Sequence, residues 1–173
     1  GQLLFASTGN GGTPHLAMER LMMQTGIKLT HVPYKGTPPA VTDVISGQVQ
    51  SMFANTLSVL PHIKSGRLRS VAIGSLKRSA ATPDIPTFDE SGVKGFEAIT
   101  WFGMLAPAGT PRDIINRVNA EVTKAVKSPA VQQKLIEQGA DPFTMTPQEF
   151  KKFFSAEIAR WAKIVKAANV TID

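Results

Sequence analysis

The stretch LLFASTGNGGTPH, residues 3–15, decides the start of the fold. Leu3 to Ala6 form a short apolar run that predicts a buried strand, and Leu16 to Gln24 have helical spacing. Thr13 and Pro14 suit the N-cap and first position of that helix. The glycines between them allow a tight turn and a close approach to a ligand. Such a strand, Gly-rich turn and helix start predict an anion site, because free N–H groups and the helix dipole point the same way.

The same loop lacks the features of the best-known nucleotide-binding turns. It has no Gly-Lys-Ser/Thr ending, as a phosphate-binding P-loop has, and no third glycine of a dinucleotide fingerprint. A flexible turn between a strand and a helix, without any ligand, therefore stays open as the alternative.

Composition favours a folded, ordinary globular chain. It has 173 residues, 42% of them hydrophobic, and no apolar run long enough for a membrane span. No signal peptide is visible at its start. The absence of cysteine excludes disulfides and thiolate chemistry. A net charge of +6 suits acidic partners, but the basic residues are scattered without interleaved aromatics, so nucleic acid is not an expected partner.

Apolar runs and helical segments alternate over the first 73 residues, which predicts an α/β lobe with a parallel sheet and crossover helices. The predicted strands are 3–6, 28–32, 49–53 and 68–73. The predicted helices are 14–24, 38–46 and 56–65, with a kink or a start at Pro61. Gly26, Gly47 and Gly66 follow these helices, where a left-handed C-cap is wanted.

The rest of the chain changes character. Residues 78–95 are connecting material, with a one-turn helix after Thr87 that Glu90 caps. Residues 96–106 predict a long, buried strand, and helices are expected over 111–127, 129–138 and 147–168, after a short extended piece at 141–144. Thr146 and Glu149 complete a capping box, and Thr110 with Asp113 approximates one. The apolar stripes of the helices are expected to be core.

Three polar loops follow the first three predicted strands. They are the Gly-rich loop, the turn from Val32 to Thr37, and residues 53–56. In a parallel sheet the carboxyl ends of the strands meet at one edge, so these loops should converge and favour binding over chemistry. For Tyr34 a structural hydrogen bond, and for Asn55 a helix N-cap, stand beside ligand contact as alternatives.

The histidines offer little catalytic or metal chemistry. Ser7 with His15, His31 or His62 and Asp43 or Asp84 shows none of the spacing of a nucleophile motif. His15 and Glu19 lie four residues apart and could form half a metal site, but no second ligand pair follows, so no metal and no cofactor are expected. We expect His15 to support the loop instead, with its ring N–H fixing a loop carbonyl.

Six ordered motifs resemble the Bug-type, or tripartite tricarboxylate transporter, periplasmic solute-binding proteins over essentially the whole chain. They are residues 6–16 (ASTGNGGTPHL), 32–36 (VPYKG), 47–49 (GQV), 61–66 (PHIKSG), 83–87 (PDIPT) and 101–107 (WFGMLAP). The resemblance implies a type II periplasmic-binding-protein fold and a two-lobed Venus-flytrap receptor, not an enzyme. Such a receptor closes on small carboxylates, often dicarboxylates, and delivers them to membrane transporter subunits.

The resemblance also assigns the site. It places the ligand carboxylate against backbone N–H groups and hydroxyls of the Gly-rich loop. The ligand-binding residues are then Ser7, Thr8, Gly9, Asn10, Gly11, Gly12, Thr13, Tyr34, Gly36 and Asn55, with His15, Lys35 and Thr56 behind them. Two positions depart from the family pattern: Gly12, where many members have Ser or Thr, and Ala54, where many have an acidic residue. They put a hydroxyl contact and selectivity for amine-bearing ligands in question.

Length is the largest departure, since family members are nearly twice this size. Residue 1 falls where their second lobe begins, so we expect a truncated chain, with the signal peptide in the missing part. Residues 1–100 are then the ligand-binding lobe, 101–106 a hinge strand, and 107–173 a helix-rich remainder of the incomplete first lobe. The alternatives are a non-binding fragment or a strand-exchanged homodimer, built through the exposed strand or helix faces. A hydrolase using Ser7 is a third.

Overall fold

The computed structural model describes residues 3–171. Their elements follow in the order β1 (Leu4–Ser7), α1 (Thr13–Thr25), β2 (Thr30–Pro33), α2 (Thr37–Ile45), β3 (Ser51–Met52), α3 (Thr56–Lys64), α4 (Arg112–Lys127), α5 (Pro129–Glu137) and α6 (Pro147–Ala167). Every predicted helix of eight or more residues is present, and so are the first three predicted strands. Within residues 3–171 we find no helix that is long and apolar enough to cross a membrane.

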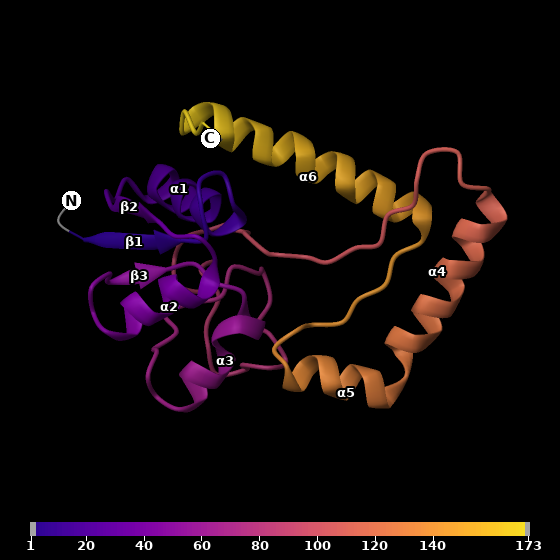
Figure 1. Cartoon of the computed structure of the whole chain (residues 1–173), viewed down its shortest axis with the longest axis horizontal. Helices are drawn as coiled ribbons and strands as arrows, with labels where there is room; N and C mark the ends of the chain where they lie inside the picture. Colours follow the sequence, from indigo (N-terminus) through magenta and orange to yellow (C-terminus); the bar gives the residue numbers. More distant parts are fainter. Residues whose placement is uncertain (1–2, 172–173) are drawn as a thin grey trace.

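The three strands form a parallel sheet in the order β2-β1-β3. This confirms the predicted α/β lobe with crossover helices. Phe5, Ala6 and Ser7 of β1 are buried, as expected for a central parallel strand that is covered on both faces. Figure 1 shows α1 on one side of the sheet and α2 and α3 on the other.

Two apolar clusters fill the two faces of the sheet. On one face Ala6 packs with Ala40 of α2 and with Val49. On the other, Ala17 of α1 packs with Phe96 and Ala98, and Phe53, Phe88 and Trp161 lie against them. We call residues 3–98 the sheet lobe.

After the sheet lobe, the chain leaves it and returns. Residues 102–146, which we call the arc, contain α4 and α5 and swing away from the lobe (Figure 1). Neither helix has a buried residue. The arc meets the lobe again after α5, where Gly139 lies against Thr56 and Leu57 and the Asp141 side chain accepts a hydrogen bond of 2.9 Å from the Ala80 N–H.

The helix α6 then docks on α1. Its Ile164 and Glu157 are buried. The Glu157 carboxylate accepts hydrogen bonds from the indoles of Trp101 (3.3 Å) and Trp161 (3.2 Å) and pairs with Arg160, so this buried charge is satisfied. The second half of α6 therefore packs on the sheet lobe itself, which the expectation for residues 107–173 did not include.

Two predicted strands are wrong. Residues 68–73 carry only an isolated bridge between Ile73 and Thr87. Residues 96–106 contain no strand, and Phe102, Met104 and Leu105 are exposed where burial was expected. Residues 102–106 run across the space between the lobe and α6 (Figure 1), without a neighbouring strand to pair with.

Helix starts follow the predicted chemistry in part. The capping box of Thr146 and Glu149 is confirmed, and Thr87 and Glu90 make the same reciprocal hydrogen bonds in a turn. The N-cap of α1 is Gly12 rather than Thr13, because the helix begins one residue earlier. The predicted Thr110–Asp113 box is wrong, because Pro111 is the N-cap of α4 and Thr110 Oγ1 donates back to the Pro107 carbonyl.

Candidate ligand-binding site

The strand order gives the sheet a topological switch point. The chain passes from β1 outward to β2, then crosses back over β1 to β3 on its other side. In open α/β sheets, ligands bind outside the carboxyl ends of the strands at such a point. The Gly-rich loop after β1 and the residues after β3 flank it here. The predicted convergence of the strand-end loops on one sheet edge therefore follows from the topology.

The Gly-rich loop is held from inside. The Ser7 side chain is fully buried, and its Oγ accepts a hydrogen bond of 3.2 Å from the Gly9 N–H and lies 3.1 Å from the Gly9 carbonyl. The Gly11 N–H donates to Nδ1 of His15 over 3.1 Å. Gly9 and Gly11 both have positive φ angles, +131° and +72°, which glycine adopts without strain.

His15 supports the loop in the opposite sense to the expected one. Its ring nitrogen accepts from a loop N–H instead of donating to a loop carbonyl. The N–H groups of Gly9 and Gly11 are consequently occupied within the loop. Of the other loop residues of the predicted site, Thr8, Gly12 and Thr13 are half-buried and Asn10 is exposed.

Two histidines stack beneath this loop. The rings of His15 and His31 lie 3.8 Å apart at 13°, and His31 stacks in turn on Phe5 with a centroid distance of 4.8 Å. Nε2 of His31 lies 2.6 Å from Ser7 Oγ. Burial, with the neighbouring His15 adding to it, lowers the pKa of His31 to about 4. The His31 ring is therefore neutral near pH 7.

Tyr34 follows β2 and touches the loop through its backbone. Its N–H donates to the Ser7 carbonyl over 3.1 Å, while its hydroxyl donates to Asp43 of α2 over 2.7 Å. That hydrogen bond raises the pKa of the Tyr34 phenol. The geometry thus matches the alternative in which the Tyr34 side chain makes a structural hydrogen bond. Any contact of Tyr34 with a ligand would come from its main chain in this conformation.

The other predicted site residues occupy the ends of β2 and β3. Gly36 is the N-cap of α2 with φ +108°, a conformation that favours glycine, and Lys35 beside it is exposed. Asn55 is the N-cap of α3, and its side chain makes no capping hydrogen bond. Thr56 is covered by Gly139 of the arc, so it lies behind the edge rather than on it.

Position 12, where the chain departs from its family pattern, has little spare room. A Cβ atom on Gly12 would lie 3.3 Å from Thr8 Oγ1 and 3.5 Å from the Gly9 carbonyl oxygen. In this chain the Thr8 hydroxyl therefore lies close to the position that the side chain of a Ser or Thr at residue 12 would occupy.

Neither nucleophilic catalysis nor metal binding finds support in this arrangement. Ser7 and His31 are in contact, but Ser7 is fully buried and its hydroxyl is engaged by Gly9. His15 Nε2 lies 3.5 Å from Glu19 Oε1. Across residues 3–171 no group of three or more His, Asp or Glu side chains could hold a metal ion.

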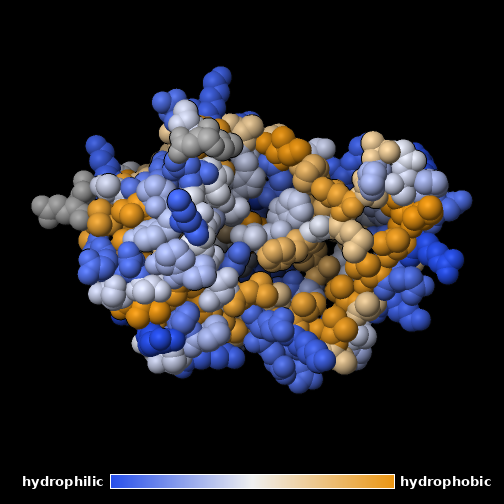
Figure 2. Space-filling model, in the orientation of Figure 1, coloured by the Kyte–Doolittle hydropathy of each residue, from blue (hydrophilic) through white to orange (hydrophobic). Residues whose placement is uncertain are grey.

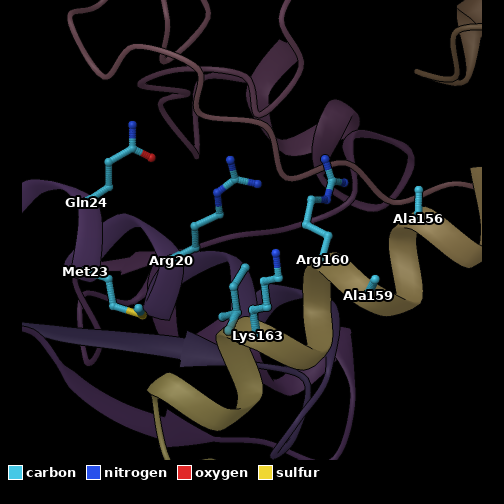
Figure 3. A pocket seen from close by; sticks show the side chains of 8 residues that line it. Arg20, Met23, Gln24, Ala156, Ala159, Arg160 and Lys163 are labelled. Carbon is cyan, nitrogen blue, oxygen red and sulfur yellow. The ribbon is translucent and has the colours of Figure 1, made fainter.

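A shallow groove elsewhere lies at the interface where α6 packs on α1 (Figure 3). It lies near the C-terminal end of α1, at the sheet edge opposite the Gly-rich loop. Arg20 donates to the carbonyls of Gly95 and Glu97, and Arg160 pairs with Glu97 and Glu157. Arg160 therefore ties α6 to the lobe, Arg20 ties α1 to residues 95–97, and both cations are balanced by carboxylates or carbonyls.

His31 is the site residue that sequence reasoning did not select. No local motif marks it, because it lies inside a strand. Its position in the site depends on the register of the two strands. His31 pairs with Phe5 in the parallel sheet and faces the same side as Ser7 and α1. A polar residue at such an inward position of a strand was the only available clue.

A parallel α/β lobe with a Gly-rich helix start at its switch point belongs to the class of small-molecule-binding modules. Comparison with known proteins narrows that class. The sequence profile described as "Tripartite tricarboxylate transporter family receptor" matches residues 1–170. The chain therefore belongs to the tripartite tricarboxylate transporter receptor family, as the sequence motifs predicted.

Individual relatives agree with this membership. Protein BugT of Bordetella pertussis is 40% identical over 172 residues, which cover 99% of this chain and 53% of BugT. A Rhodopseudomonas palustris protein, MatC, solved with bound malate, has a TM-score of 0.77 and 30% identity, covering 94% of this chain and 56% of MatC.

A further R. palustris structure, described as bound to adipate, superposes with a TM-score of 0.88 at 35% identity. It covers 98% of this chain and 57% of its own. The chain thus spans about half the length of these relatives. The family description names a receptor rather than an enzyme, which agrees with the expectation from the motifs.

Proposed function

We propose that this chain is a receptor module for small carboxylates, bound at the switch point between β1 and β3. The observation that carries the proposal is the meeting of the Gly-rich loop and two further strand-end loops at that edge, in a member of this family. The malate and adipate in the related structures support a dicarboxylate-like ligand. The whole receptor would deliver it, in the periplasm, to the membrane subunits of a tripartite transporter.

The start of α1 is the proposed carboxylate seat. Its N-cap, Gly12, provides no side chain, and no capping hydrogen bond is made there. The first N–H groups of a helix lack intrahelical partners, so a ligand carboxylate can serve as the cap and gain from the helix dipole. The Thr13 N–H and the hydroxyls of Thr8 and Thr13 are the proposed donors, and the Gly12 N–H, which makes a long hydrogen bond of 3.4 Å to the Gly9 carbonyl, would join them by exchanging that bond for the ligand. Asn55 and the main chain of Tyr34 and Gly36 complete the rim.

Ligand-dependent stability tests this proposal. Adipate and malate, titrated up to millimolar concentrations, should each raise the midpoint of thermal unfolding by mass action, reaching about 2.7 kcal/mol at 100 times the dissociation constant. The uncharged diamide of adipate is the matched ligand control and should have no effect. No shift with either dicarboxylate would contradict binding by this chain.

A pair of threonine variants locates the site. Thr13→Val removes one proposed hydroxyl donor without changing the side-chain shape and should weaken adipate binding about five- to tenfold, the effect of one hydrogen bond. Thr25→Val, at the other end of the same helix, is the control, since its hydroxyl donates to the Leu21 carbonyl. Equal affinities of both variants and the parent chain would place the carboxylate elsewhere.

A second candidate function, assembly, is favoured by the apolar face of the arc. Phe102, Met104 and Leu105 are more than two-thirds exposed. The apolar stripe of α4, formed by Ile114, Val118 and Val122, is exposed to a smaller extent. Figure 2 shows hydrophobic residues around the hollow on the arc side of the molecule. We infer that these surfaces suit a second polypeptide, and a homodimer is the simplest such assembly.

Light scattering with paired variants separates this candidate from the first. Val118 of α4 and Val71 of the sheet lobe are both exposed. If the arc forms a dimer interface, Val118→Asp should yield monomers, whereas Val71→Asp should leave the dimer intact. A monomeric parent chain at all accessible concentrations would rule the dimer out.

A further inference from the structure

The two stacked histidines are connected to the Gly-rich loop through complementary donors and acceptors. Ser7 Oγ has one proton and two lone pairs. If it donates to the Gly9 carbonyl and accepts from the Gly9 N–H, its remaining lone pair accepts from His31. The geometry therefore assigns the proton of neutral His31 to Nε2.

The same reasoning fixes His15. Its Nδ1 accepts the Gly11 N–H, so the proton of the neutral ring lies on Nε2, the atom 3.5 Å from Glu19. A second proton could enter this ring only at Nδ1. There it would face the Gly11 N–H, and two donors cannot share a hydrogen bond. Protonation of His15 is thus incompatible with the observed position of Gly11.

The two sides of the stack have different surroundings. Glu19 of α1 lies 3.5 Å from His15 Nε2, while Phe5 and Ser7 of β1 bury the His31 side of the stack. With ring centroids only 3.8 Å apart, a charge on one ring opposes a charge on the other. Loop geometry and histidine charge are consequently coupled at one place in the fold.

We propose that His15 and His31 are positioning residues that hold residues 7–12 in the carboxylate-accepting shape while both rings are neutral, and that protonation of His15 at Nδ1 releases the loop. This inference rests on the proposed function for its meaning, because the loop is the proposed ligand seat. It adds that binding should weaken in acid through the protein itself, apart from any protonation of the ligand.

The first test needs no ligand. In the free chain labelled with ¹⁵N, the Gly11 amide resonance is followed from pH 8 to pH 4.5 together with the ring resonances of the three histidines. The Gly11 amide should shift along with the His15 ring, and its hydrogen exchange, corrected for pH, should accelerate about five- to tenfold as its hydrogen bond is lost. A Gly11 amide that stays in place while the His15 ring titrates would overturn the inference.

The second test uses variants and adipate as the probe. His15→Asn keeps an acceptor near the position of Nδ1 but cannot take up a proton. With its own affinity at pH 8 as the reference, it should lose about five- to tenfold less affinity for adipate between pH 8 and pH 5 than the parent loses. Adipate ionises identically with both proteins, so the ratio of their affinities cancels its contribution. His62→Asn, altered in α3 beside Arg67, is the control and should follow the parent.

The outcomes separate this inference from the proposed function. If adipate binds neither protein at any pH, retained binding fails, and the Gly11 titration still decides the role of the histidines. If adipate binds and the parent and His15→Asn keep a constant affinity ratio across pH, the histidine inference is overturned and the carboxylate site stands. Should His15→Asn fail to fold, the Gly11 titration of the parent chain gives the decision.

Discussion

The helices α1 and α4 share a pattern of apolar residues but differ in whether those residues are buried. Both carry apolar residues at helical spacing. In α1 the residues Leu16, Ala17 and Met18 are buried against the sheet lobe, whereas in α4 Val118 is 41% exposed and Ile114 54%. The spacing of a stripe thus predicts a helix and its apolar face, and leaves open whether anything covers that face.

The sheet lobe and the arc are consequently stabilised by different means. The lobe buries aromatic rings between a sheet and its helices, and burial of apolar area is the largest favourable term in folding. The arc depends on local interactions, such as the hydrogen bond from Asn119 to the Met145 carbonyl and the capping box where the arc meets α6, and on its attachment to the lobe at Asp141. Substitutions in the sheet lobe should therefore lower the free energy of unfolding more than matched substitutions in the arc.

The largest effect is expected for Phe96→Ala in the sheet lobe. Phe96 is fully buried among Phe53, Phe88 and Ala17, and emptying that space should lower the free energy of unfolding by about 3–5 kcal/mol. Phe102→Ala in the arc is the matched control. Its ring is 75% exposed, so a change within about 0.5 kcal/mol is expected. Urea denaturation measures both, and similar losses would show that the arc is covered in solution.

The next effect concerns the attachment of α6. Glu157→Gln removes the charge that pairs with Arg160 and accepts from two indoles, and should cost about 2–3 kcal/mol because the guanidinium loses its buried partner. Tryptophan fluorescence during denaturation reports it, since Trp101 and Trp161 both contact this carboxylate. Glu137→Gln, on exposed α5, is the control. An unchanged transition for Glu157→Gln would mean that α6 is held by its apolar contacts alone.

Acid should weaken the lobe through His31. Its pKa falls from about 6.5 in an unfolded chain to about 4 in the folded one, so the unfolded state takes up the proton first. The contribution is complete above pH 6.5 and is lost as the pH falls from there toward 4. After allowance for partial solvent exposure, about 1–2 kcal/mol should disappear over that range.

Denaturation curves of the parent and of His31→Phe, recorded between pH 7.5 and pH 4, isolate this contribution. The variant keeps a ring in the stack and cannot titrate, so its stability should depend less on pH over this window. Parallel curves for the two proteins would show that His31 is protonated equally in both states.

The smallest effect should come from the start of α6. Thr146→Ala removes the hydroxyl that accepts from the Glu149 N–H and should cost about 1 kcal/mol, with faster hydrogen exchange in the first turn. Ser128→Ala is the control, because Ser128 is the N-cap of α5 without a capping hydrogen bond. Equal losses of stability in the two variants would show that the capping box does not stabilise the start of α6.

Local signals in the sequence located the helices, three strands and the loops of the site. Gly26, the Thr146 box and the Gly-rich turn each act over a few residues, so their effects could be predicted from neighbours. The failures at 68–73 and 96–106 arose because a strand also needs a partner, which no local pattern supplies.

The same limit applies inside the site. The contact of His31 with Ser7 depends on the register of β2 against β1, and that of Tyr34 with Asp43 on how α2 packs. Neither partner could be chosen from spacing alone. The conformation of the loop between β1 and α1 was predictable from its glycines, whereas the groups that hold it in place required the tertiary structure.

The attachments at Gly139 and Asp141 have a consequence for proteolysis. The exposed turn at Ala108 and Gly109 is the kind of site that proteases cut. A cut there would leave two fragments, yet the second would stay bound to the first through the contact of Gly139 with Thr56, the Asp141 bond to Ala80 and the docking of α6 on α1. A nicked preparation should therefore migrate as one particle under native conditions and separate only when denatured.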